Sequence, residues 1–218
     1  MGLLDRFKKK SLFREAFRLV HRGKYLEAFK NYEEILKIDP LDSMAWSNKG
    51  NVLGKLGRFD EAFKCYDKSL ELDPTYIDAW CGKGWTFEKL NRFDEALRCF
   101  DKALELDPSY FKAWNGKAVV ISKLERFDEA LKCYDKALNL DPYYKDAWTG
   151  KGSVFFKLER FDEALRCFDK VLELDVAYIV AWYNKGIFLK DIGENHEALS
   201  CFDKALELDQ TYVDAWYL

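Results

Sequence analysis

The sequence predicts an all-α protein, built as an α-solenoid of antiparallel helix pairs stacked side by side. Three residue types carry this prediction, because tryptophan, proline and cysteine each recur at an interval of 34 residues. A fixed period of this length indicates a tandem array of units that bury their apolar faces against one another. The recurring residues are Trp46, Trp80, Trp114, Trp148, Trp182 and Trp216; Pro40, Pro74, Pro108 and Pro142; and Cys65, Cys99, Cys133, Cys167 and Cys201.

The period also sets the expected organisation of the chain. An N-terminal segment, 1–8, precedes a single repeat domain, 9–212, and residues 213–218 begin an incomplete capping helix. The first unit matches the others less well, since Leu12 stands in the position of tryptophan. The six units are 9–42, 43–76, 77–110, 111–144, 145–178 and 179–212.

Each unit is expected to hold two amphipathic helices. In the third unit, Trp80, Gly84 and Phe87 fall at helical spacing, and the apolar pattern resumes at Phe93 after a short polar interruption. Pro108 then ends the second helix, because proline lacks a backbone donor and restricts the residue before it. The turn that follows starts the next unit in the same phase.

Two units depart from this turn pattern. Val176 and Gln210 stand where the other units have proline. Without proline to stop the helix, we expect a looser turn after residue 175 or a second helix that runs further.

Glycines form two rows on the first helices, although each costs roughly 1 kcal/mol relative to alanine inside a helix. One row, with bulky residues around it, indicates a seam where two helices approach closely. The other row has no evident seam, so its glycines either let a ligand approach the backbone or are merely tolerated. The first row is Gly50, Gly84, Gly152 and Gly186, and the second is Gly82, Gly116 and Gly150.

The unit pattern resembles that of the tetratricopeptide repeat (TPR) family, and the resemblance covers residues 9–218. It implies a right-handed superhelix whose concave groove, built mostly from the first helices, receives an extended peptide or a partner helix. It also implies a scaffold without enzymatic activity. The residues that carry the resemblance are Trp80, Gly84, Phe87, Phe93, Ala96, Phe100, Ala103 and Pro108.

The groove is where the units differ from one another, so binding residues are expected there. Trp85 is the one tryptophan outside the 34-residue series; it is either an aromatic anchor for a partner or a packing residue between helices. The residues expected to project into the groove are Asn48, Asn51, Trp85, Asn115, Val119, Phe156, Tyr183, Asn184 and Ile187.

The sequence offers little catalytic or cofactor chemistry. His21 and His196 lie five units apart and cannot meet in a stacked array. The repeated cysteines are separated by an intervening helix, which is too far for disulfides or a shared zinc, so they are expected to be small packing residues. No Gly-Lys pair is followed by Ser or Thr, as a phosphate loop requires. We therefore expect no enzyme, no cofactor and no metal.

Charged residues suggest two further features. A lysine series on the first helices is either a ladder for an anionic ligand or, as we favour, a set of stems packed between helices with solvated ammonium groups. Residues 1–30 carry nine basic and three acidic side chains, a local charge of +6. Leu3, Leu4 and Phe7 either touch an acidic surface or, more simply, cap the first helix pair. The lysines are Lys49, Lys83, Lys117, Lys151 and Lys185.

The leading functional hypothesis is a protein–protein interaction scaffold that holds an extended peptide or helix of a partner protein. One alternative is a structural array that self-associates through its uncapped terminal helices. Nucleic acid is not an expected partner, because the chain carries a net charge of -3 and lacks a basic stripe. No apolar run is long enough for a transmembrane segment and no signal is evident, so a cytoplasmic location is expected.

Overall fold

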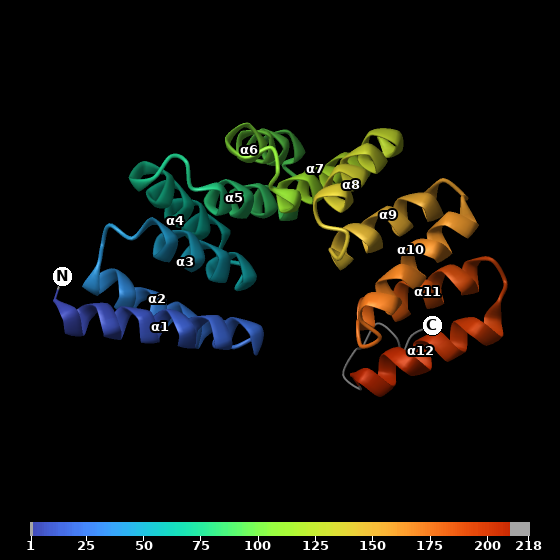
Figure 1. Cartoon of the computed structure of the whole chain (residues 1–218), viewed down its shortest axis with the longest axis horizontal. Coiled ribbons are helices and arrows are strands. Elements are labelled where there is room, and N and C mark those ends of the chain that lie inside the picture. The colour runs from blue at the N-terminus through green and yellow to red at the C-terminus, as the bar shows by residue number, and fades with distance from the viewer. Residues whose placement is uncertain (1, 210–218) are drawn as a thin grey trace. The chain divides into compact units, whose positions relative to one another are not determined.

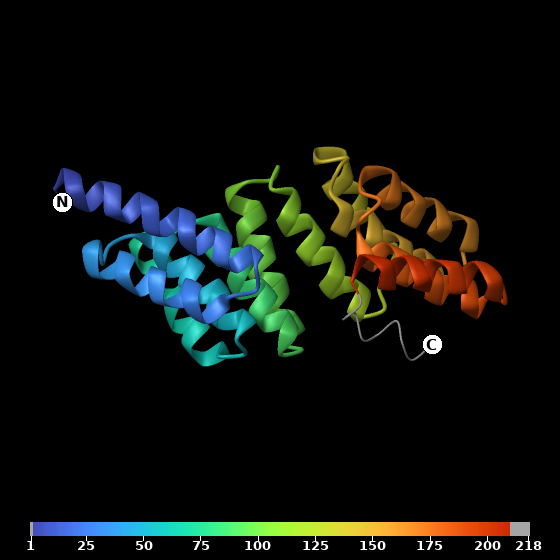
Figure 2. The same cartoon turned by 90° about the horizontal axis from the view of Figure 1, so that it is seen from below.

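The computed structural model describes residues 2–209 and shows only helices and turns in that part of the chain (Figure 1). Consecutive helices form antiparallel pairs joined by short turns (Figure 2). The predicted all-α fold of stacked helix pairs is confirmed. None of the described helices is long and apolar enough to cross a membrane.

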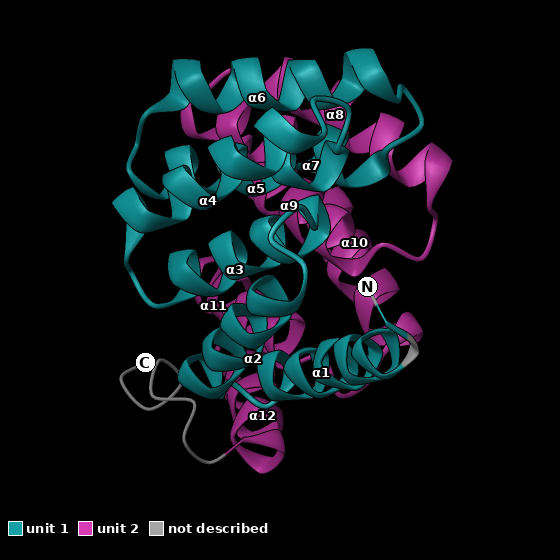
Figure 3. Cartoon of the chain, turned by 90° about the vertical axis from the view of Figure 1, so that its left-hand side faces the viewer, with its two compact units in different colours: residues 1–116 teal, residues 117–218 magenta. Residues whose placement is uncertain are grey.

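The chain divides into two compact units, which Figure 3 shows in different colours. Unit 1 spans residues 1–116 and unit 2 spans residues 117–218, and the boundary falls inside α7 (Phe111–Lys123). The other helices of unit 1 are α1 (Leu3–His21), α2 (Tyr25–Ile38), α3 (Ser43–Lys55), α4 (Phe59–Leu72), α5 (Ile77–Lys89) and α6 (Phe93–Leu106). Those of unit 2 are α8 (Phe127–Leu140), α9 (Lys145–Lys157), α10 (Phe161–Leu174), α11 (Ile179–Asp191) and α12 (Asn195–Leu208).

The N-terminal residues extend the first helix. Helix α1 begins at Leu3, so residues 3–8 continue directly into the first repeat. The expectation that apolar residues here cap the first pair is wrong for Leu4 and Phe7, because 84% and 65% of their surfaces are exposed. Lys9 holds this end in place, since its Nζ lies 2.6 Å from Asp39 Oδ2 and 2.5 Å from Asp42 Oδ2 in the turn after α2.

The turns between repeats are closed by tryptophan. The Trp80 indole Nε1–H donates to the carbonyl oxygen of Pro74 at 3.1 Å, and Trp46, Trp114 and Trp148 make the same bond to their own prolines. Because this bond uses a carbonyl and not the proline ring, any residue can supply it.

The fifth repeat shows this directly. The Trp182 indole donates to the carbonyl of Val176 at 2.8 Å, and α10 ends at Leu174, the position equivalent to Leu106 of α6. The expected looser turn or longer helix after residue 175 is therefore wrong. Gln210, the other departure from proline, lies outside the described residues, as do Trp216 and the expected capping segment 213–218.

The first row of glycines marks a seam inside four of the helix pairs, as predicted. A Cβ atom added at Gly84 would lie 3.0 Å from the Phe100 ring of α6, which has no exposed surface. The corresponding distance at Gly50 is 2.7 Å, to the ring of Tyr66 on α4. Since ordinary carbon contacts are about 3.5–4.0 Å, a side chain at either position would displace a core ring. In unit 2, Gly152 faces Phe168 and Gly186 faces Phe202.

The second row of glycines forms a joint between successive repeats, so the interpretation as an opening for a ligand is wrong. A Cβ atom at Gly116 would lie 2.3 Å from the ring of Phe100, and one at Gly82 would lie 2.6 Å from the ring of Tyr66. In unit 2, one at Gly150 would lie 2.5 Å from Tyr134 Oη. A ring from the second helix of the preceding repeat fills each space, and at Gly82 the Oδ1 atom of Asn51 on α3 would lie equally close, at 2.6 Å.

Candidate protein-interaction surface

The residues expected to bind a partner all lie on first helices, and we describe them unit by unit. In unit 1, Asn48 and Asn51 lie on α3, Trp85 on α5 and Asn115 on α7. Asn51 is exposed, whereas Asn48 and Trp85 are half-buried. In unit 2, five half-buried residues complete the set: Val119 on α7, Phe156 on α9, and Tyr183, Asn184 and Ile187 on α11.

Asn115 was expected to project into the groove, but the structure buries it, with only 3% of its surface exposed. The equivalent residues one repeat before and after it, Cys81 and Thr149, are also buried. This position of the first helix therefore faces the packed interior. The Asn115 Oδ1 atom finds no hydrogen-bond partner among the described residues.

Asn51 and Trp85 occupy equivalent positions in successive repeats and are each supported by an aromatic residue. The Tyr66 hydroxyl donates to Asn51 Oδ1 at 2.9 Å. The Trp85 ring meets the Phe100 ring edge-on, with centroids 5.3 Å apart. Trp85 therefore packs with one part of its surface and leaves the rest accessible, and its role as an anchor for a partner stays a prediction.

In unit 2, two other residues of the expected set, Phe156 and Tyr183, pack against aromatic side chains. The Tyr183 ring lies 6.1 Å from the Phe202 ring, and the Phe156 ring lies 5.6 Å from the Phe188 ring. These contacts fix ring orientation through packing, because edge-on and tilted aromatic pairs contribute beyond simple burial.

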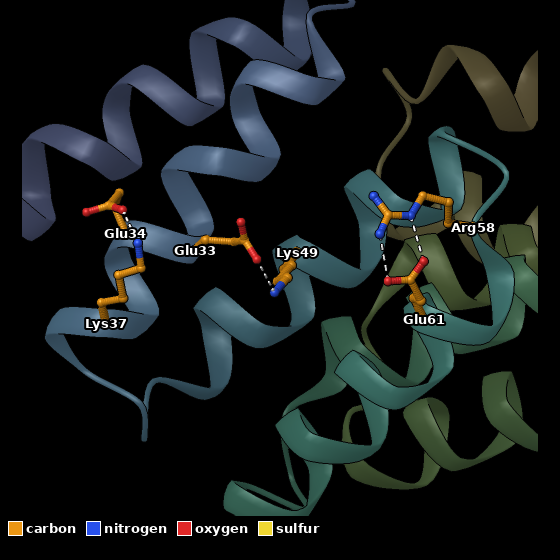
Figure 4. A network of polar contacts seen from close by, with 6 residues as sticks. All are labelled: Glu33, Glu34, Lys37, Lys49, Arg58 and Glu61. Carbon is orange, nitrogen blue, oxygen red and sulfur yellow. Dashed lines mark hydrogen bonds and ion pairs between the residues drawn. The ribbon is translucent and has the colours of Figure 1, made fainter.

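The lysine series is neutralised by carboxylates. Lys83 Nζ lies 2.6 Å from Asp67 Oδ1, a residue of the preceding second helix 16 positions earlier. Lys49 pairs with Glu33 in the same way at 3.2 Å, as Figure 4 shows. In unit 2, Lys151 pairs with Asp135 and Lys185 with Asp169. The lysine stems do pack between helices, but their ammonium groups join successive repeats and do not form an unoccupied ladder for an anion.

The six cysteines are free and buried, as expected of packing residues. Burial raises the pKa of the Cys65 thiol to about 11 and that of Cys81 to about 12. Within residues 2–209, no group of three or more metal-binding side chains comes together. His21 and His196 are both exposed, on α1 and α12.

A thiol-labelling experiment tests this placement. At neutral pH, we expect an aromatic disulfide reagent to react slowly with the folded chain, because these thiols are inaccessible and almost fully protonated. All six should react rapidly once the chain is unfolded in urea, as followed by the absorbance of the released thiolate. One rapidly reacting thiol per folded chain would contradict the buried placement.

The tetratricopeptide repeat family matches this sequence five times, at residues 43–76, 77–110, 111–144, 146–176 and 179–212. These segments make up most of the chain and coincide closely with the second to sixth repeats. The chain belongs to the tetratricopeptide repeat family. Such TPR proteins generally act as protein-interaction scaffolds.

Solved TPR structures resemble this chain over most of its length. YrrB, whose structure is described as a TPR protein with an unusual peptide-binding site, shares 26% identity; the match covers 85% of this chain and 96% of YrrB, with a TM-score of 0.56. A thermophilic TPR protein of Thermus thermophilus shares 20% identity over 84% of this chain and 98% of its own, with a TM-score of 0.77. PilW, a type IV pilus biogenesis factor, shares 22% identity over 97% and 96%, with a TM-score of 0.76. A sequence search among curated proteins gave no significant match.

These TPR repeats share one contact that the sequence analysis missed. The residue before each second helix is Arg58, Arg92, Arg126 or Arg160 in the second to fifth repeats, and each guanidinium binds the glutamate three residues later. The Arg92 guanidinium also lies 4.6 Å from the centre of the Phe87 ring. The recurrence of arginine and glutamate at a spacing of three was the available signal. Figure 4 shows this pair for Arg58 and Glu61 at the start of α4.

Proposed function

We propose that this TPR chain is an interaction scaffold that binds an extended peptide or a helix of a partner protein along the accessible faces of its first helices. The observation that carries the proposal is the contrast between packing and accessible positions. The packing positions repeat glycine and aromatic residues, whereas the accessible position occupied by Asn51, Trp85 and Ile187 changes its residue type from repeat to repeat. A surface built for packing alone needs no such variation.

The chemistry of unit 1 suits an extended peptide. Tyr66 engages the carbonyl oxygen of the Asn51 amide, which leaves the amide N–H groups to donate to a peptide carbonyl. The half-buried ring of Trp85 offers a rigid apolar surface, and tryptophan is a residue type that commonly dominates binding energy. The peptide-binding site reported for YrrB, at 26% identity, supports the same kind of use.

Substitution at Trp85 tests this function. Peptides selected on the full chain from a phage-displayed random library are expected to bind Trp85→Ala at least about tenfold more weakly, because an anchor of this kind contributes roughly 2–4 kcal/mol. Affinities are measured by calorimetry with synthetic peptides, and circular dichroism confirms that the variant is folded. Tyr143→Ala serves as the matched control, since 74% of Tyr143 is exposed and it lies in the turn between α8 and α9. Equal losses in the two variants would contradict the role of Trp85.

Three narrower expectations remain predictions. End-to-end self-association through the uncapped terminal helices is untested, because the expected capping segment 213–218 lies outside the described residues. Nucleic-acid binding by the lysine series is disfavoured, because carboxylates pair with Lys49, Lys83, Lys151 and Lys185. A cytoplasmic location rests on the sequence alone.

A further inference from the structure

Unit 2 contains a pocket of about 550 Å³ between α10, α11 and α12. Apolar side chains, including Leu165 and Leu189, and the ring of Trp182 form part of its wall. Glu194 and Glu197 line it from the start of α12. The pocket thus combines an apolar wall with carboxylates that are open to solvent.

Two residues that lie together at this place in the fifth repeat are replaced in the sixth. The residues 34 positions before Leu189 and Glu194 are Phe155 and Arg160. The Arg160 guanidinium lies 4.6 Å from the centre of the Phe155 ring, and its Nε donates to Glu163 at 2.6 Å. The sixth repeat keeps the glutamate, as Glu197, but has neither the guanidinium nor the ring. It therefore has a carboxylate and a space where its neighbour has a partly exposed arginine.

The charges around the pocket are unbalanced. Asp169 is neutralised by Lys185, whose Nζ lies 2.5 Å from its Oδ1. The lining therefore holds three carboxylates and one ammonium group, a net charge of -2. Neither Glu194 nor Glu197 pairs with a cation in the described part of the chain, whereas each of the other five second helices follows a lysine or arginine that pairs with a glutamate.

We propose that this pocket binds an arginine side chain of a partner protein. A planar guanidinium can form paired hydrogen bonds with carboxylates and can stack on an aromatic ring, while its stem contacts apolar residues. The arginines of the second to fifth repeats show that this position in the repeat accepts a guanidinium beside a glutamate. The lining includes none of the residues proposed above for peptide binding on the first helices, so the two proposals can fail separately.

The first test uses the full chain and a blocked Gly-Arg-Gly peptide. We expect saturable binding with a Kd on the order of 1 mM, because a single side chain contributes only a few kcal/mol. In NMR spectra, the shifts should concentrate on the Trp182 indole N–H and on the amides of Ser200 and Cys201. Peptides with citrulline or lysine in place of arginine should bind at least about tenfold more weakly, since citrulline lacks the charge and lysine the planar fork. Equal affinity for the arginine and citrulline peptides would overturn the proposal.

The second test introduces at position 194 the arginine that the second to fifth repeats have at this place. Glu194→Arg should fill the pocket and weaken binding of the Gly-Arg-Gly peptide by at least about tenfold, because the new guanidinium can pair with Glu197 as Arg160 pairs with Glu163. Glu207→Arg makes the same charge change on α12 outside the pocket and should leave binding unchanged. An unchanged affinity in Glu194→Arg, with its helical circular dichroism retained, would overturn the proposal. Dimerisation of the wild-type chain that Glu194→Arg abolishes would assign the pocket to a second copy and overturn the assignment to a different partner.

Discussion

Phe100→Ala is expected to lower the free energy of unfolding of unit 1 by about 3–5 kcal/mol. The ring has no exposed surface and lies against Gly84 in its own repeat and Gly116 in the next. Removing it therefore leaves a cavity that both glycine-bearing helices would have to move to fill. Urea unfolding followed by circular dichroism measures the change.

Phe7→Ala is the matched control for this prediction. The same atoms are removed, but 65% of Phe7 is exposed, so we expect a loss below about 1 kcal/mol. If the two substitutions destabilised the chain by similar amounts, the ring of Phe100 would not be the joint that the structure shows.

Gly116→Ala should destabilise the protein by about 1–3 kcal/mol, although alanine is the better helix former. The added Cβ would lie 2.3 Å from the Phe100 Cε1 atom, and the same part of this ring already lies against Gly84. The steric cost should therefore exceed the gain in helix propensity. The change is measured by the same urea unfolding experiment.

Gly54→Ala provides the opposite expectation within the same kind of helix. A Cβ there would meet Thr86 Oγ1 at 3.6 Å and Tyr66 Oη at 3.9 Å, both ordinary contacts, so the helix gain of up to about 1 kcal/mol should be retained. If Gly116→Ala stabilised the protein as Gly54→Ala does, the contact between position 116 and the Phe100 ring would not be a tight one. A Gly116→Ala chain that also carries Phe100→Leu should recover part of the loss, since the smaller side chain relieves the contact.

The sequence predicted the elements well because their signals are local. Helical spacing of apolar residues and the 34-residue period were sufficient to predict helix pairs, and they agree with helices such as α5 and α6. The turn at Val176 was misjudged because the essential group is a backbone carbonyl, which residue identity does not reveal.

The contacts between repeats were harder to predict because each joins two helices. Gly116 meets Phe100 and Lys83 meets Asp67, in both cases 16 positions earlier in the chain. Within the sequence of its own helix, Gly116 has no evident role and Lys83 has no evident partner. Comparing positions separated by 16 residues would have shown an aromatic residue before each such glycine and a carboxylate before each such lysine. The burial of Asn115 has the same origin, since the apolar pattern of its own helix does not show which neighbour covers it.

The pairing of each ring with a glycine on the following helix has a consequence for changes in chain length. From α4 to α5, from α6 to α7 and from α8 to α9, the earlier helix supplies the aromatic ring and the later helix supplies the glycine that makes room for it. A deletion or duplication of 34 residues, wherever it starts in the period, brings equivalent partners together again. Loss of a lone helix would instead place two like surfaces against each other. Evolution or engineering can therefore lengthen such a protein by whole repeats, because each added repeat makes the same contacts with its neighbours.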